Sequence, residues 1–365
     1  GMGMGGNPMA SLGGLLGGRG ERNSFGNTQT GLQGRWLDVT LRTSRNPNLA
    51  EATQSVPADS KLAPILKLVS PQDQKSAPPD DGEKDPESFE RPKGKIYLYW
   101  GCGETVRPGQ PRVLDTATAS PAEFAKFFQA RRATQRGAHL AHGRPVWPNP
   151  TDTRMVPEGA TLQGEHAFSG QGVPEGFKFT IPGAQDIMPP FDLAQRAAAG
   201  ATRIEWKTLP TARAYFLAAM GARGENGMVI WSSSEVPETG LSLIDYLPNS
   251  AIDRWLKEKV LLDPSVTRCA VPKGAFGEDA MLRAIAYGSE LNVAHPPRPS
   301  DPKQPWEPQW AAKVRVKSVA TTILGADMGG AAGRQPARET KPDESGKDDP
   351  KNIAPVEILR GIFGR

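Results

Sequence analysis

The feature that most constrains the fold of this chain is the repeated occurrence of short segments in which apolar and polar residues alternate. Leu37, Val39 and Leu41 alternate with polar residues, and Phe177 and Phe179 repeat the pattern later. A period of two is typical of β-strands with one buried face. At least six segments carry it, and the 40 glycines and 35 prolines among 365 residues provide turns between them. The sequence therefore predicts a mostly-β fold.

Three stretches contain too few apolar residues to form a core. They are a glycine-rich head at 1–31, a charged, proline-rich loop at 71–92 and a polar stretch at 327–354. We expect the first and last to be disordered, and the second to be a solvated loop. The remaining segments group into two antiparallel β-sandwich-like modules, at 32–200 and 201–326.

Two short helices are predicted within these modules. Ser120 is a natural N-cap, and Glu123 completes a capping box three residues later, so a helix is expected at 120–136. A second helix, carrying Trp255, is expected at 251–262.

The second module has a set of residues typical of one sandwich family. Trp206 is followed nine residues later by Tyr215, and Leu282–Ala286 forms a late strand that ends in alanine. These segments resemble the Trp, Tyr and penultimate strands of a fibronectin type III-like β-sandwich. This chain departs from that family at two points. Ala280 stands where the family usually has an aromatic residue, and the predicted helix at 251–262 is an insertion. The resemblance implies a structural or binding module. The whole chain resembles uncharacterised exported proteins of proteobacteria.

The last predicted strand combines apolar and basic residues. Val314 and Val316 alternate with Lys313, Arg315 and Lys317. This pattern predicts an outer strand with one solvated face.

The two cysteines have three open interpretations. Cys102 follows a predicted strand and lies between two glycines. It could form a disulfide with Cys269 or be a buried free thiol. It could also be a nucleophile with His139 or His142 as its base, although no family-specific residues surround it.

A basic run surrounds the first predicted helix and the segment after it. It consists of Lys126, Arg131, Arg132, Arg136 and Arg144. One interpretation is a patch for anionic surfaces such as lipid headgroups, and the other is the solvated face of the helix. The net charge of +4 is small, and no aromatic residues are interleaved with these basic residues on the same face of the predicted helix. A nucleic-acid partner is therefore not expected.

Metal and cofactor signatures are missing from the sequence. His139 and His142 lie three residues apart, but no third ligand has a matching spacing. No phosphate-binding loop, dinucleotide motif or nucleophile elbow occurs. The sequence predicts neither a metal nor a cofactor.

The final eleven residues, 355–365, form a short amphipathic tail. Its apolar residues at helix-like spacing include Ile358, Leu359, Ile362 and Phe363. So short a helix needs a surface to fold on. The tail either docks on its own module or binds a partner.

The leading functional hypothesis is a non-enzymatic exported protein that binds or scaffolds at the bacterial envelope. We expect it in the periplasm or at the cell surface, directed by a signal peptide that would precede the residues given. Its partner is unknown: an envelope protein or a glycan is a candidate, and peripheral membrane contact is another. The sequence contains no run of 18 apolar residues, so no membrane-spanning helix is predicted. The alternative is a cysteine-dependent hydrolase or transferase that uses Cys102 with His139 or His142.

Overall fold

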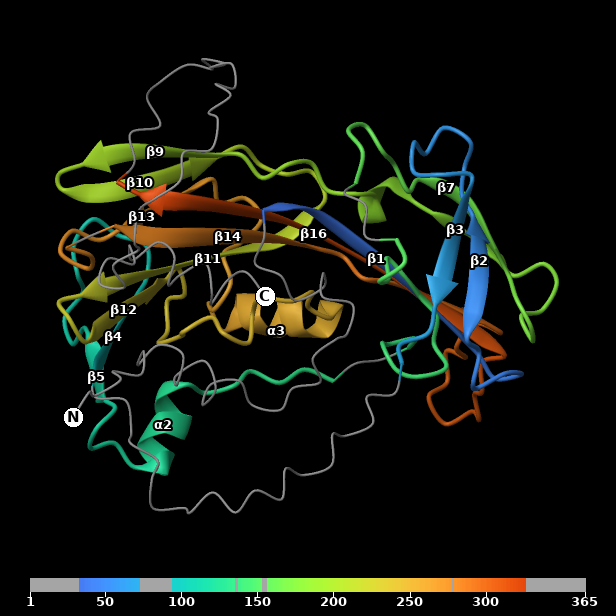
Figure 1. Cartoon of the computed structure of the whole chain (residues 1–365), viewed down its shortest axis with the longest axis horizontal. Coiled ribbons are helices and arrows are strands. Elements are labelled where there is room, and N and C mark those ends of the chain that lie inside the picture. The colour runs from blue at the N-terminus through green and yellow to red at the C-terminus, as the bar shows by residue number, and fades with distance from the viewer. Residues whose placement is uncertain (1–32, 73–93, 135–136, 153–155, 278, 326–365) are drawn as a thin grey trace, which may run out of the picture.

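The computed structural model describes residues 33–72, 94–134, 137–152, 156–277 and 279–325 (Figure 1). Over these residues the chain is mostly β with two short α-helices, which confirms the predicted fold class. No helix among them is long and apolar enough to cross a membrane. The predicted head at 1–31, the stretch at 327–354 and the tail at 355–365 lie outside the described residues, and so does 71–92 apart from its first two residues.

Within the described residues, most strands belong to one sheet of 13 strands. In order across the sheet, the main path runs through β5 (Arg112–Asp115), β4 (Lys95–Trp100), β12 (Gly227–Ser232), β11 (Ala212–Arg223), β14 (Ala280–Gly288), β16 (Trp310–Leu324), β1 (Gly34–Thr43), β6 (Val146–Trp147), β3 (Ile65–Val69), β2 (Glu51–Ser55), β7 (Gly164–Ser169) and β8 (Lys178–Ile181). In addition, β15 (Leu291–His295) pairs with β16. The sheet is mixed, because β4 and β12 are parallel.

A second sheet of three strands covers one face of the large sheet. It is formed by β13 (Arg268–Val271), β10 (Ala201–Trp206) and β9 (Leu193–Ala198). Ile204 and Trp206 from this sheet share a buried core with Leu217 and Leu282 from the large one. The two sheets therefore form the layered part of the molecule, seen at the left of Figure 1.

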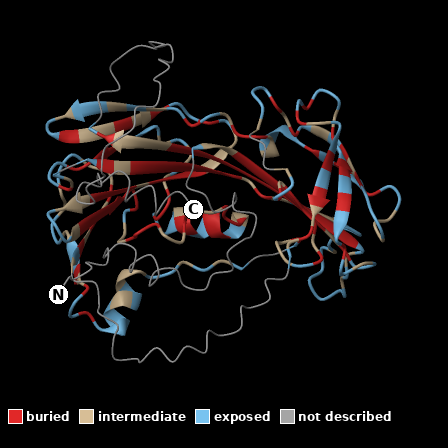
Figure 2. Ribbon diagram, viewed as in Figure 1, coloured by how far each residue is buried: buried red, intermediate tan, exposed pale blue. Residues whose placement is uncertain are grey.

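Helix α3 (Asn249–Lys257) packs on the opposite face of the large sheet (Figure 1). Its buried Ile252 and Trp255 belong to the same apolar cluster as Phe216, Ile285 and Val319. The central strands are consequently covered on both faces, and Figure 2 shows them buried along most of their length.

Helix α2 (Pro121–Phe127) has the predicted capping box. The backbone N–H of Glu123 donates to Ser120 Oγ at 3.2 Å, and the Ser120 N–H donates to the Glu123 carboxylate at 2.6 Å. The helix ends at Phe127 rather than at 136, so the prediction was too long. Beyond the helix, the chain is bonded to the loop that precedes α3: the backbone N–H of Arg131 donates to Ser242 Oγ at 3.0 Å. The second helix also ends early, at Lys257.

Strand pairing crosses the predicted module boundary between residues 200 and 201. Strand β1 pairs with β16 from Gly34 opposite Val319 to Thr43 opposite Trp310. Strand β4, which precedes the boundary, pairs in parallel with β12, which follows it. Segments assigned to different modules thus complete one sheet. Trp206 and Tyr215 contact each other with ring centroids 5.5 Å apart. The fibronectin type III-like resemblance stays a prediction.

Candidate functional site

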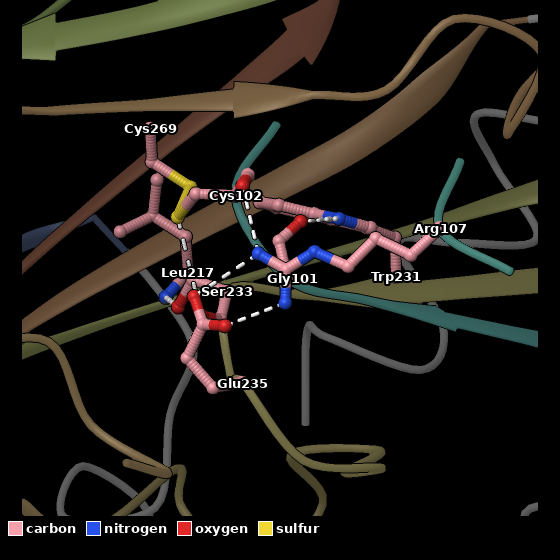
Figure 3. The surroundings of a disulfide bond; sticks show 8 residues. All are labelled: Gly101, Cys102, Arg107, Leu217, Trp231, Ser233, Glu235 and Cys269. Atoms are coloured by element: carbon pink, nitrogen blue, oxygen red, sulfur yellow. Dashed lines mark hydrogen bonds and ion pairs between the residues drawn. A yellow bond between two sulfur atoms is a disulfide. The ribbon is translucent and has the colours of Figure 1, made fainter. Parts of the chain in front are cut away.

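The two cysteines are joined by a disulfide with a sulfur–sulfur distance of 2.06 Å (Figure 3). Cys269 lies on β13 of the small sheet, and Cys102 follows β4 of the large sheet. The bond therefore links the two sheets across 167 residues of sequence. Neither cysteine is a free thiol. In this oxidised state Cys102 has no thiolate for nucleophilic attack.

The turn that carries Cys102 is held by its neighbours. Trp231 donates from Nε1 to the carbonyl of Gly101 at 3.1 Å. Arg107 donates to the Cys102 carbonyl at 3.1 Å and pairs with Glu235 at 2.5 Å (Figure 3). These contacts fix the backbone that positions the sulfur, so the polar groups around the disulfide have structural partners.

The two histidines considered as bases or ligands interact with backbone carbonyls. His139 Nδ1 lies 3.2 Å from the Gly137 carbonyl, and His142 Nδ1 lies 3.4 Å from that of Pro71. Burial and the nearby Arg144 lower the pKa of His139. Within the described part of the chain, no group of three His, Cys, Asp or Glu side chains is arranged to hold a metal ion.

The candidate basic patch is divided in the structure. Lys126 and Arg132 are exposed, whereas Arg131 is held by ion pairs to the buried Glu238 and to Glu258. Arg144 is half-buried and donates to the His139 carbonyl at 3.2 Å. Arg136 lies outside the described residues. Arg131 and Arg144 thus have internal partners, which leaves a smaller exposed basic surface than the sequence suggests.

The predicted solvated face of the last strand is buried, so that prediction was wrong. Lys313 and Lys317 are 1% and 0% exposed, and Arg315 is 8% exposed. Strand β16 lies in the interior of the sheet between β1 and β14, and the loop before α3 covers its basic side. Alternation of apolar and charged residues looks the same in sequence whether the charged face meets water or buried partners.

Arg315 has a buried carboxylate partner on the neighbouring strand. Its Nε donates to Asp38 Oδ1 at 2.8 Å, and its Nη2 donates to Asp38 Oδ2. Its guanidinium also lies 4.4 Å from the ring centroid of Tyr246. Burial alone would lower the pKa of Arg315, but the Asp38 carboxylate outweighs that effect and raises it. Arg315 is therefore charged in the folded protein.

Lys317 holds the loop that precedes α3. Its Nζ donates to the Ile244 carbonyl at 3.1 Å, lies 3.9 Å from Asp245 Oδ1 and lies 4.7 Å from the Tyr246 ring. Burial lowers the pKa of Lys317 to about 8, although Asp245 opposes this effect. Further along β16, Lys313 Nζ lies 3.4 Å from Glu290 Oε1. This row of cations is thus a buried structural network.

An open pocket of about 400 Å³ lies at one end of the large sheet. It is lined by side chains and backbone of β4, the end of β5 and the turn between β11 and β12: Gly94, Lys95, Tyr97, Asp115, Ala117, Arg223, Asn226 and Gly227. The turn approaches β4 closely, since a Cβ on Gly94 would lie 2.3 Å from the Asn226 carbonyl oxygen. Two cations, a carboxylate, an amide and an aromatic ring therefore converge on one accessible hollow.

Arg223 is the most firmly held side chain of this pocket. Its Nη2 donates to Tyr99 Oη at 3.0 Å and to the Ala275 carbonyl at 2.9 Å. Its guanidinium stacks over Tyr97 at 4.4 Å from the ring centroid. This pocket could not be predicted from the sequence, because its residues come from segments more than 100 positions apart. The only available signals were the aromatic residues of Lys95–Trp100 and the turn at 224–227.

The chain matches no protein-family model, no curated protein and no solved structure. The geometry of its own residues is thus the basis for a functional proposal.

Proposed function

We propose that this chain is a non-enzymatic binding or scaffolding protein of an oxidising compartment at the bacterial envelope, in the periplasm or at the cell surface. The observation that carries the proposal is the disulfide that joins the two sheets. Both cysteines of the sequence are used in it. Structural disulfides persist in oxidising compartments and are rare in the cytosol of most organisms.

Two further observations support a binding role. Arg315 and Lys317 on β16 are buried beside the loop before α3 and pair with Asp38 and Asp245, which suits a structural function. The accessible polar groups gather instead in the pocket around Tyr97 and Arg223. A concave site with a few converging polar groups is the usual geometry of a ligand site.

Thiol accessibility combined with fractionation tests this proposal. Cells that express the native gene are separated into cytosolic and envelope fractions, and a large maleimide reagent is added before and after reduction. We expect the protein in the envelope fraction, with no label before reduction and two labels after it. A cytosolic protein with two reactive thiols would overturn the proposal.

The same samples address the cysteine-dependent hydrolase or transferase considered from the sequence. After mild reduction, a catalytic Cys102 would react fast and show a pH dependence set by its base. Slow labelling of Cys102, and still slower labelling of the 2% exposed Cys269, is the result expected for a structural disulfide.

A further inference from the structure

The pocket beside Tyr97 has cationic donors that no described residue uses. The hydrogen bonds of Arg223 all leave from Nη2, so its Nε and Nη1 groups have no hydrogen-bond partner among the described residues. The exposed Lys95, on the same strand as Tyr97, has no ion pair there either. Donors that are held in place before binding favour the binding of an anion, because few side chains must become ordered when it binds.

A carboxylate in the same pocket limits how much negative charge the ligand can carry. Asp115 lies directly opposite Lys95 in the β4–β5 register, yet no ion pair joins the two side chains. One oxygen of Asp115 accepts from the Ala117 N–H at 3.0 Å, which fixes the carboxylate at the pocket wall. It can accept hydrogen bonds from hydroxyl groups, but it repels a second negative charge.

The remaining walls suit a ring-shaped, hydroxylated molecule. Tyr97, with the Arg223 guanidinium 4.4 Å from its ring centroid, provides an aromatic wall. The exposed Asn226 offers both an amide donor and an acceptor at the rim. A volume of about 400 Å³ is within the usual size range of small-ligand sites.

On the premise of the binding role proposed above, we propose that this pocket binds a uronic acid residue of an acidic polysaccharide. The single carboxylate of the sugar pairs with Arg223 and Lys95. Its hydroxyl groups donate to Asp115 and bond to Asn226. A dianionic phosphate fits less well, because Asp115 opposes its second charge.

Calorimetric titration of the full chain with trigalacturonate tests the proposal. Maltotriose is the neutral comparison, and inorganic phosphate is the competing anion. We expect trigalacturonate to bind, maltotriose to bind at least tenfold more weakly, and affinity to fall as salt is raised. The Lys95→Gln variant should weaken trigalacturonate binding about tenfold, the usual size for one charge-assisted hydrogen bond. Lys257→Gln, which changes an exposed lysine on α3, is the matched control and should bind as the parent does.

Two further variants make the outcome decisive. Arg223→Gln should abolish binding, with circular dichroism reporting whether loss of its contacts to Tyr99 and Ala275 unfolds the chain. Asp115→Asn should strengthen competition by phosphate. The proposal is overturned if trigalacturonate does not bind, if maltotriose binds equally well, or if Lys95→Gln and Lys257→Gln behave alike. Location and the disulfide are measured separately, so a failure here leaves the envelope role standing, whereas a reduced cytosolic protein would remove its premise.

Discussion

Replacing Asp38 by alanine should destabilise the protein more than any exposed charge substitution. Asp38 is fully buried and accepts two hydrogen bonds from Arg315. Without it, the guanidinium stays buried against the Tyr246 ring and loses its counter-charge. Removing one partner of a buried ion pair typically costs about 3–5 kcal/mol. Because whole domains are stable by only about 5–15 kcal/mol, this loss should be easy to measure.

Urea unfolding followed by tryptophan fluorescence measures the effect. We expect the midpoint to fall while the slope of the transition stays unchanged. The matched control is the exposed ion pair between Glu51 and Lys67, in which both side chains are more than half exposed. Glu51→Ala should cost about 0.5 kcal/mol or less, because exposed pairs contribute little.

A double substitution separates the unpaired charge from the loss of packing. Asp38→Leu with Arg315→Met removes both charges and keeps an apolar side chain at each position. Replacing a buried pair by apolar residues is often neutral or stabilising, so this variant should recover most of the loss. If Asp38→Ala costs no more than Glu51→Ala, the reasoning about the buried pair is refuted.

Three other perturbations have defined outcomes. Since the pKa of Lys317 is about 8 in the folded protein and 10.5 ordinarily, the unfolded chain binds more protons between these values. Stability should therefore rise with pH across that window, by up to about 3 kcal/mol, and Lys317→Met should flatten the rise in urea melts. Replacing Cys102 and Cys269 by serine should cost about 5 kcal/mol in the chain-entropy account, visible as a lower thermal midpoint; an unchanged midpoint would contradict this. Burial lowers the pKa of His166 below 6.5, so stability should fall as pH drops below about 6.5, and His166→Gln should reduce that dependence.

The strands and helix starts could be predicted from local patterns. Leu37, Val39 and Leu41 point to a common buried core, as their alternation predicts. The capping box at Ser120 also forms as expected. Such signals are contained within a few neighbouring residues, so one sequence is enough to detect them.

The pairing of distant segments could not be predicted in this way. Strand β1 finds its partner β16 at the other end of the described chain, and β4 runs parallel to β12. No turn sequence connects either pair. The same limitation hid the pocket, since Asp115 and Arg223 meet only after these pairings have formed.

The charged residues of β16 specify the register of the β1–β16 pair more closely than its apolar residues do. A slip of one residue would move Asp38 and Arg315 to the apolar face, so the core already opposes it. A slip of two residues keeps every side chain on its own face, and Val39 would still meet an apolar partner, Ala312 or Val316. In that alignment, however, Arg315 would lie opposite Trp36 or Thr40 instead of Asp38, and a buried guanidinium would lose its carboxylate. Because 277 residues separate Asp38 from Arg315, no turn can set the register. We infer that the buried ion pair is retained for the specificity of this pairing rather than for net stability.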